Sequence, residues 1–191
     1  MSEAKEERMF LSNPATGASV DCIRQDGIDV LDKAVKKAKI AQLDWEKKPF
    51  KDRAIHILAI RDFIAAEADR IAGVIAKSTG KTLVDALSTE VIPAAMGAGY
   101  YAKKTESFLR KEKLRPGNFL FANKISWIER VPWGVIGIIS PWNYPFAIPF
   151  HEVVMALMAG NAVVLKVATQ SQEVGEIIGE AMNAGKLPDG L

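Results

Sequence analysis

The sequence contains very little cysteine and histidine. Cys22 is the single cysteine among 191 residues, and the two histidines, His56 and His151, lie far apart. One cysteine excludes a disulfide framework and a cysteine-based zinc site. The two histidines share no metal-ligand spacing, so we expect no metal site. Cys22 has no histidine near it in sequence to activate the thiol, and we interpret it as an ordinary small packed residue.

A strong excess of charge is also missing. The chain has 25 Lys and Arg against 23 Asp and Glu, a net charge of +2, which argues against a nucleic-acid or membrane partner. The N-terminus lacks the apolar core of a signal peptide, so we expect a cytoplasmic protein. One uncharged run, residues 131–150, contains four prolines that would break a membrane-spanning helix.

The overall composition is typical of a folded globular domain, because 49% of the residues are hydrophobic and 25% are charged. The first two-thirds of the chain predicts a short strand, three helices and a hairpin. The strand and helices are expected at residues 18–23, 28–45, 49–77 and 82–111. The hairpin arms are expected at residues 119–121 and 124–130, after a Pro-Gly-Asn turn.

The last third of the chain has a different pattern. Two short apolar runs, residues 134–140 and 162–166, predict strands buried on both faces. Helices are expected at residues 145–158 and 171–184, the second with Ser171 as its N-cap and Gly185 at its C′ position. Strand–helix–strand–helix order predicts an α/β fold with a parallel, doubly wound sheet and helices on both faces.

Two glycine-containing motifs resemble nucleotide-binding loops only in part. Ser78–Thr82 ends like a phosphate-binding loop, but Ile75 stands where that loop requires glycine. Gly97–Ala102 matches G-x-G-x-x-A, yet it follows a proline-containing helical stretch. We interpret the first as a helix junction and the second as helix packing through small residues.

Asn143 and Lys166 are the most informative polar residues, because ligands bind outside the carboxyl ends of parallel strands. Asn143 lies in a proline-bounded turn after the first strand and suits donation to a developing oxyanion. Lys166 ends the second strand and suits an anionic or hydroxyl-rich ligand such as a nucleotide. A lysine that merely extends its ammonium into water is an equally good interpretation. His151 follows the same turn and is a further candidate to line a site.

These motifs together resemble the aldehyde dehydrogenase superfamily. The resemblance rests on Val131–Val135, Ser140–Pro145 and Ala159–Lys166, and it extends in collinear order over essentially the whole chain. Further similar segments are Asn13–Gly17, Trp45 with Arg53, Thr79–Lys81 and Ala184–Leu191. The resemblance implies a Rossmann-like cofactor fold and oxidation of an aldehyde to an acid with NAD or NADP.

The resemblance also implies roles for individual residues. Asn143 would donate to the oxyanion, and Lys166 would bond the adenosine ribose. The cofactor would be contacted by Ile139, Ser140, Pro141, Trp142, Asn143, Lys166 and Thr169. The aldehyde passage would be lined by Tyr144, Ala147 and His151.

Thr169 departs from the pattern of NAD-preferring members, which place a glutamate three positions after the lysine. A hydroxyl can donate to a 2′-phosphate that a carboxylate would repel. Threonine is also found here in the NADP-using, non-phosphorylating glyceraldehyde-3-phosphate branch. We therefore expect NADP to be accepted, and the residues leave open whether it is preferred over NAD.

The resemblance is confined to the N-terminal part of the family. It divides the chain into a helical part of the cofactor domain (1–112), an oligomerisation hairpin (113–131) and the first βαβα of the Rossmann-like domain (132–191). The family's general-base glutamate and catalytic cysteine have no counterpart, and Cys22 precedes the cofactor fold. We expect no turnover by these residues alone, and self-association if the protein is full length. The alternative is a non-catalytic nucleotide-binding or protein-interaction module.

Overall fold

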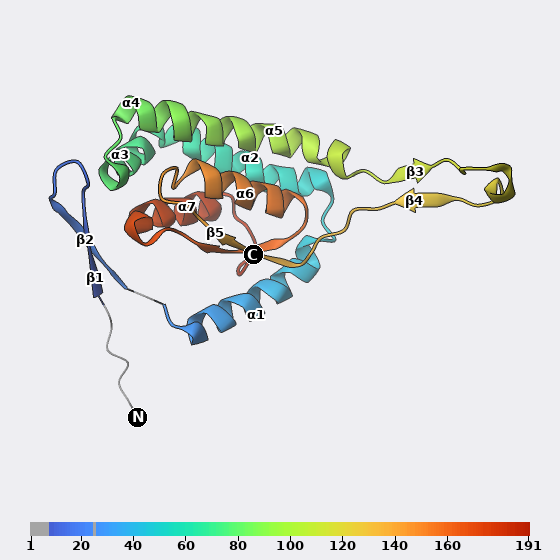
Figure 1. Cartoon of the computed structure of the whole chain (residues 1–191), viewed down its shortest axis with the longest axis horizontal. Helices are drawn as coiled ribbons and strands as arrows, with labels where there is room; N and C mark the ends of the chain where they lie inside the picture. Colours follow the sequence, from blue (N-terminus) through green and yellow to red (C-terminus); the bar gives the residue numbers. More distant parts are fainter. Residues whose placement is uncertain (1–7, 25) are drawn as a thin grey trace.

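The computed structural model describes residues 8–24 and 26–191. A helical body holds one small parallel sheet, and two antiparallel ribbons lie outside it (Figure 1). The N-terminal ribbon pairs β1 (Arg8–Ser12) with β2 (Ser19–Arg24) around a turn. Asn13 Oδ1 closes that turn by accepting hydrogen bonds from the amides of Ala15 and Thr16 at 2.8 and 3.1 Å.

Cys22 belongs to β2, where its backbone is opposite Phe10. Its side chain lies outside the described part of the structure, so its interpretation as a packed residue stays a prediction.

The helical pattern of the sequence is largely confirmed. Helix α1 (Ile28–Trp45) has the predicted bounds. The second predicted helix is two helices, α2 (Phe50–Ala66) and α3 (Ala68–Thr79), because the chain bends at Glu67. The third consists of α4 (Leu83–Ala86), a π turn η1 (Leu87–Val91) and α5 (Ile92–Leu109).

The core lies where α2, α5 and α6 (Ala147–Met158) pack together. Helix α2 contributes Ile57, Ile60 and Ile64, each with no exposed surface. Gly97 provides the notch on α5 into which His151 of α6 fits, since a methyl group at Gly97 would overlap the imidazole. This confirms that the Gly97–Ala102 segment packs helices through small residues.

The parallel sheet consists of β5 (Val135–Ile139) and β6 (Ala162–Lys166), with α6 as the crossover and α7 (Gln172–Ala184) following β6. The α/β expectation is confirmed. The expectation that both faces of these strands are buried is wrong for β5. Ile138 is buried, but Gly137 and Ile139, which share the opposite face, are exposed, Ile139 to 81%.

Of the two predicted caps of α7, the N-cap position is confirmed and the C′ position is wrong. Ser171, the last residue of the 3₁₀ turn η3 (Thr169–Ser171), is the N-cap residue, but its buried hydroxyl has no hydrogen-bond partner among the described residues. Gly185 has φ of −68°, and the left-handed residue is Lys186 with φ of 51°. Gly185 instead permits close packing, because a Cβ there would lie 2.5 Å from Ile60 Cγ1.

The second ribbon projects far from the body as an arm (Figure 1). Its strands are β3 (Glu112–Leu114) and β4 (Ser126–Ile128), so the predicted arm at residues 119–121 is wrong. Residues 119–121 form a 3₁₀ turn, η2 (Phe119–Phe121), closed by the Phe121 amide on the Asn118 carbonyl at 3.2 Å. The Pro-Gly-Asn sequence ends β3 before them and leaves these residues at the tip.

In the part of the chain that the structure describes, no helix is both long enough and apolar enough to span a membrane.

Candidate functional site

The carboxyl ends of β5 and β6 lie side by side. Ile139 is opposite Lys166 in the parallel register, and the Ser140 amide donates to the Lys166 carbonyl at 2.9 Å. The turn that carries Asn143 and the strand end that carries Lys166 are therefore at one edge of the sheet. This is the edge at which open α/β folds bind ligands.

The turn after β5 is anchored at both ends and exposed in its middle. Ser140 is buried, and its hydroxyl donates to the Pro141 carbonyl at 3.1 Å. Beyond the turn, Phe146 is buried and stacks on Phe150 with ring centroids 5.6 Å apart. Between these anchors Asn143 is exposed, so its side-chain amide is available to a ligand at the sheet edge.

Lys166 and Thr169, the donors predicted to bind the cofactor, lie at and just after the carboxyl end of β6. The exposed Lys166 ammonium has one hydrogen-bond partner among the described residues, the Val167 carbonyl at 3.2 Å, and no carboxylate within ion-pair distance. Thr169 is half-buried at the start of η3. The apolar side chains of Ile139 and Trp142, 81% and 64% exposed, lie at the same edge. An ammonium, a hydroxyl and apolar surfaces fit a nucleotide ligand.

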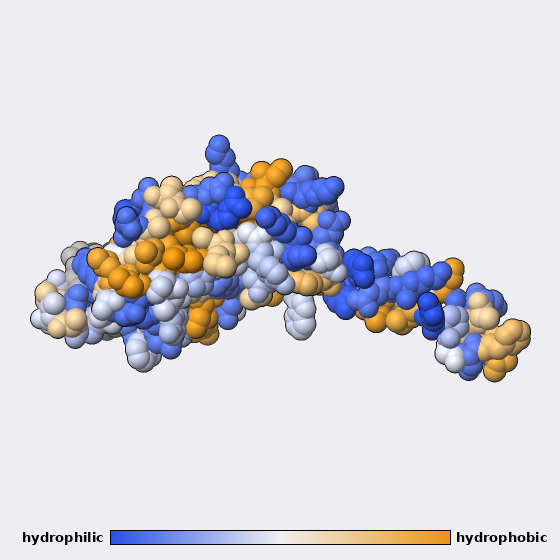
Figure 2. Space-filling model, turned by 90° about the horizontal axis from the view of Figure 1, so that it is seen from above, coloured by the Kyte–Doolittle hydropathy of each residue, from blue (hydrophilic) through white to orange (hydrophobic). Residues whose placement is uncertain are grey.

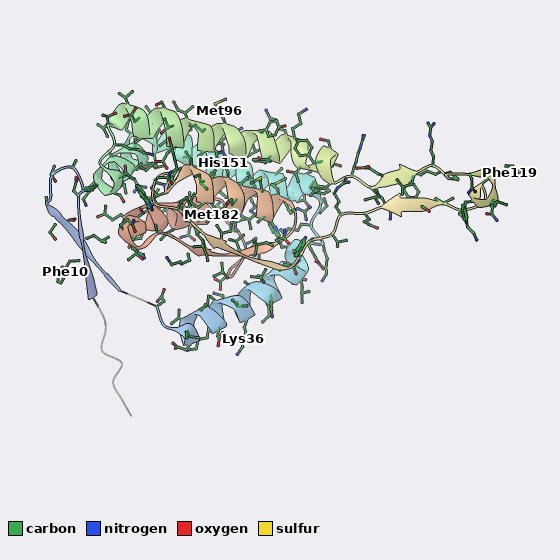
Figure 3. All side chains as sticks on the ribbon, viewed as in Figure 1. Phe10, Lys36, Met96, Phe119, His151 and Met182 are labelled. Atoms are coloured by element: carbon green, nitrogen blue, oxygen red, sulfur yellow. The ribbon has the colours of Figure 1, made fainter. Side chains whose placement is uncertain are left out.

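The three residues expected along an aldehyde passage have different surroundings. Tyr144 is partly exposed, and its ring lies under the Lys81 ammonium, which is 3.8 Å from the ring centroid. Ala147 is buried. His151 Nε2 lies 3.1 Å from the Pro93 carbonyl oxygen of α5, and Figure 3 shows the side chain within the helical body. The structure thus directs His151 toward α5, and a passage lined by all three stays a prediction.

Sequence reasoning missed Asn161, which organises the entry into β5. Its Oδ1 accepts hydrogen bonds from the amides of Trp133 and Gly134 at 2.7 and 3.1 Å, and its Nδ2 donates to the Ala156 carbonyl. A buried asparagine with both ends of its amide satisfied fixes its surroundings firmly. The Gly160-Asn161 turn was its only visible signal.

Trp45 and Arg53 hold α1 and α2 against the end of α6. The Trp45 indole donates to the Leu157 carbonyl at 2.8 Å. The guanidinium of Arg53, 4% exposed, lies over the Phe50 ring and reaches the Glu46 carbonyl. Burial lowers the pKa of Arg53 below its usual value. Both residues therefore join helices and do not contribute to the ligand edge of the sheet.

Sequence reasoning also missed the pairing of Lys81 with Glu90. The structure shows that Ser78–Thr82 is a helix junction, as expected, because Gly80 ends α3 with φ of +77° and Thr82 caps α4. Lys81 instead forms an ion pair with the fully buried Glu90 at 2.6 Å. Glu90 follows the polar residues Ser88 and Thr89 in the sequence, so no local pattern distinguished it as a buried carboxylate.

A cavity of about 640 Å³ lies beside β6 and α7, away from the Asn143 turn. Its lining includes Val163, Leu165, Gly175 and Leu191. The Leu191 carbonyl accepts the Val163 amide at 2.8 Å, so the last residue of the chain lies against the outer edge of β6.

Comparison with known proteins gives consistent results. The chain is 36% identical over 155 residues to the 4,4'-diapolycopene aldehyde oxidase of Methylomonas sp., covering 81% of this chain and 29% of that protein. It is 34% identical over 164 residues to the N-succinylglutamate 5-semialdehyde dehydrogenase of Vibrio cholerae, covering 84% and 32%.

Among solved structures, the NADP-dependent glyceraldehyde-3-phosphate dehydrogenase of Bacillus halodurans, complexed with NADP, aligns with a TM-score of 0.88 and 31% identity. That alignment covers 96% of this chain and 39% of the other. The chain thus spans about a third of the length of the relatives it matches. Residues 1–191 match the family described as the aldehyde dehydrogenase family, and the chain belongs to that family as an N-terminal part of its fold.

Proposed function

We propose that this chain supplies the oxyanion donor and the ribose-binding residues of an enzyme that oxidises an aldehyde to a carboxylic acid with NADP or NAD. The observation that carries the proposal is the parallel register of β5 and β6. That register brings the Asn143 turn and Lys166 to one sheet edge, joined by the 2.9 Å hydrogen bond from Ser140 to Lys166.

Asn143 has the chemistry of an oxyanion donor. Its exposed amide group can donate to the oxygen of an aldehyde as negative charge develops there, and the proline-bounded turn holds the backbone in place beforehand. A preorganised donor of this kind contributes roughly a hundredfold to a thousandfold in rate.

Lys166 and Thr169 bind the adenosine ribose in this proposal. The ammonium and the hydroxyl donate to ribose or 2′-phosphate oxygens, while Ile139, Ser140, Pro141 and Trp142 contact the remainder of the nucleotide. The bound nicotinamide cofactor supplies the hydride acceptor. The NADP complex of the glyceraldehyde-3-phosphate relative supports acceptance of NADP by this chain.

Tyr144, Ala147 and His151 are proposed to lie along the aldehyde passage. The relatives are named for quite different aldehydes, including a diapolycopene aldehyde and a succinylglutamate semialdehyde. The resemblance therefore supports the reaction class and an aldehyde substrate, without selecting one aldehyde.

We assign three parts to the chain, with bounds 1–112, 113–131 and 132–191. The middle part is the arm, which we propose joins copies of the protein. Its tip is apolar and exposed, with Phe119 at 92% and Leu120 at 83% (Figures 2 and 3). Apolar surface of this kind, rimmed by charged side chains, is typical of protein–protein contacts.

We expect the 191 residues alone not to turn over, because Cys22 lies in the N-terminal ribbon rather than at the sheet edge. A non-catalytic nucleotide-binding or interaction module is the second candidate. The exposed Trp133, 91%, and Ile139, 81%, favour it, since such surface suits a partner.

The deciding experiment purifies the protein from its own cells and measures its intact mass and its NADP- and NAD-dependent aldehyde oxidation. A mass above twice 20.9 kDa with oxidation supports the enzyme. A mass of 20.9 kDa without oxidation supports the module. A preference for NAD of about tenfold or more, which is about 1.4 kcal/mol, would contradict the assignment of Thr169 to a 2′-phosphate.

A further inference from the structure

The carboxylate of Glu90 has no exposed surface and uses both of its oxygens. Oε1 accepts from the Lys81 ammonium at 2.6 Å. Oε2 accepts from the amides of Phe146 and Ala147 at 2.9 and 3.2 Å. A buried charge is retained only when it is paired and hydrogen-bonded in this way.

The two amides belong to the start of α6, where no intrahelical carbonyl can accept them. Glu90 therefore caps α6 from a different element, since Phe146 itself has no side-chain cap. A negative charge at this position also interacts favourably with the helix dipole. The first turn of α6 follows directly on the turn that carries Asn143 and Tyr144.

Besides pairing with Glu90, Lys81 contacts the turn directly through the ring of Tyr144. Its side chain is 21% exposed, and its ammonium lies 3.8 Å from the centroid of the Tyr144 ring. A lysine in this position gains from both the carboxylate and the aromatic face. Lys81 and Glu90 thus contact the turn through the Tyr144 ring and through the backbone that follows it.

Local sequence explains how the pair is brought to this point. Gly80 stops α3 and Thr82 starts α4, which leaves Lys81 between two helices. Glu90 lies in the π turn η1, which contains one residue more per turn than an α-helix would. One residue corresponds to about 100° of rotation, so a regular α-helix would orient Glu90 differently relative to α6.

We propose that Lys81 and Glu90 are positioning residues, which fix the first turn of α6 and through it the turn that presents Asn143. The inference rests on the proposed function in one respect, namely that the turn must be held in place so that Asn143 can act on an aldehyde. The mechanical part, that Glu90 holds the Phe146 and Ala147 amides, is independent of any aldehyde or cofactor.

The experiment measures amide hydrogen exchange in the 191-residue chain, residue by residue, for Glu90→Gln. Exchange of the Phe146 and Ala147 amides is expected to rise about tenfold or more relative to Val154 in the middle of α6, because a charged acceptor is replaced by a neutral one. Lys81→Met provides a second variant, and Lys81→Arg is expected to restore much of the protection.

Glu173→Gln is the matched control. It removes the 2.7 Å ion pair of Lys77 with Glu173, which joins α3 to α7, and it does not contact the Asn143 turn. If Glu90 contributed only to general stability, Glu90→Gln and Glu173→Gln would raise amide exchange to a similar extent. Local opening confined to Phe146 and Ala147 in Glu90→Gln supports the proposal, and unchanged exchange at these two amides overturns it.

Activity separates this proposal from the proposed function. If exchange rises as expected but Asn143→Ala does not slow aldehyde oxidation by the protein from its own cells, the oxyanion role fails and the positioning stands. If exchange is unchanged while Asn143→Ala slows aldehyde oxidation, the positioning fails and the oxyanion role stands. Where both hold, Glu90→Gln should lower kcat with little change in KM for the cofactor.

Discussion

The indole N–H of Trp45 donates a 2.8 Å hydrogen bond to the carbonyl oxygen of Leu157, which joins the end of α1 to the end of α6. Trp45 has no exposed surface, so this bond forms within the packed interior. Trp45→Phe removes the donor and leaves unfilled volume. We expect the free energy of unfolding to fall by about 2 kcal/mol, measured by chemical denaturation followed by circular dichroism.

Trp133→Phe is the control for this prediction, because Trp133 is 91% exposed. Its effect on the free energy of unfolding should stay within about 0.5 kcal/mol. Equal losses for the two variants would show that the buried bond is not what stabilises this junction.

Two glycines near α7 should respond in opposite directions to alanine. Gly185→Ala is expected to lower the free energy of unfolding by about 1–3 kcal/mol, because its Cβ would lie 2.5 Å from Ile60. Gly179→Ala is expected to raise it by roughly 0.5–1 kcal/mol, because its Cβ meets no atom within 4 Å and alanine favours helix. Thermal or chemical denaturation compares the pair, and a gain in both variants would refute the close approach at Gly185.

The Lys81–Glu90 pair should show strong coupling in a double-mutant cycle. Lys81→Met leaves the buried Glu90 carboxylate without its cation and is expected to cost about 3 kcal/mol. Adding Glu90→Gln removes the buried charge, so the double variant should be more stable than Lys81→Met by about 1 kcal/mol or more. Additive losses in denaturation experiments would mean that the two side chains do not act as a pair.

Thr169→Glu tests the cofactor assignment. The new carboxylate would repel a 2′-phosphate, so the affinity for NADP should fall about tenfold while that for NAD changes less. Calorimetric titration of both cofactors measures the difference. Gln170→Glu places the same charge one residue further along and should leave the ratio of affinities near its original value.

The arm predicts self-association through its tip. Phe119→Ser together with Leu120→Ser should shift the protein toward smaller species in sedimentation velocity, because the two side chains are 92% and 83% exposed there. Ile55→Ser is the control, since Ile55 is 66% exposed and belongs to α2 rather than to the arm. A similar shift with the control would remove the tip as the contact.

The sequence determined most of the local structure and the protein family. Apolar runs and helical spacing predicted α1 and both parallel strands, because each of these depends on periodicity within a single segment. The motifs around Asn143 and Lys166 indicated the family, and the rule for parallel strands placed both residues at one sheet edge. The roles expected for them stay predictions.

Only the tertiary structure decided the contacts between distant segments. The hydrogen bonds of Glu90 to the amides of Phe146 and Ala147 at the start of α6 join residues that are 56 and 57 positions apart. The requirement for glycine at position 185 was also decided by a distant contact, because it comes from the close approach of Ile60 and not from the conformation at the end of α7. The inward direction of His151 was likewise decided by packing against Gly97 of α5, because no local pattern specifies which partner a side chain meets.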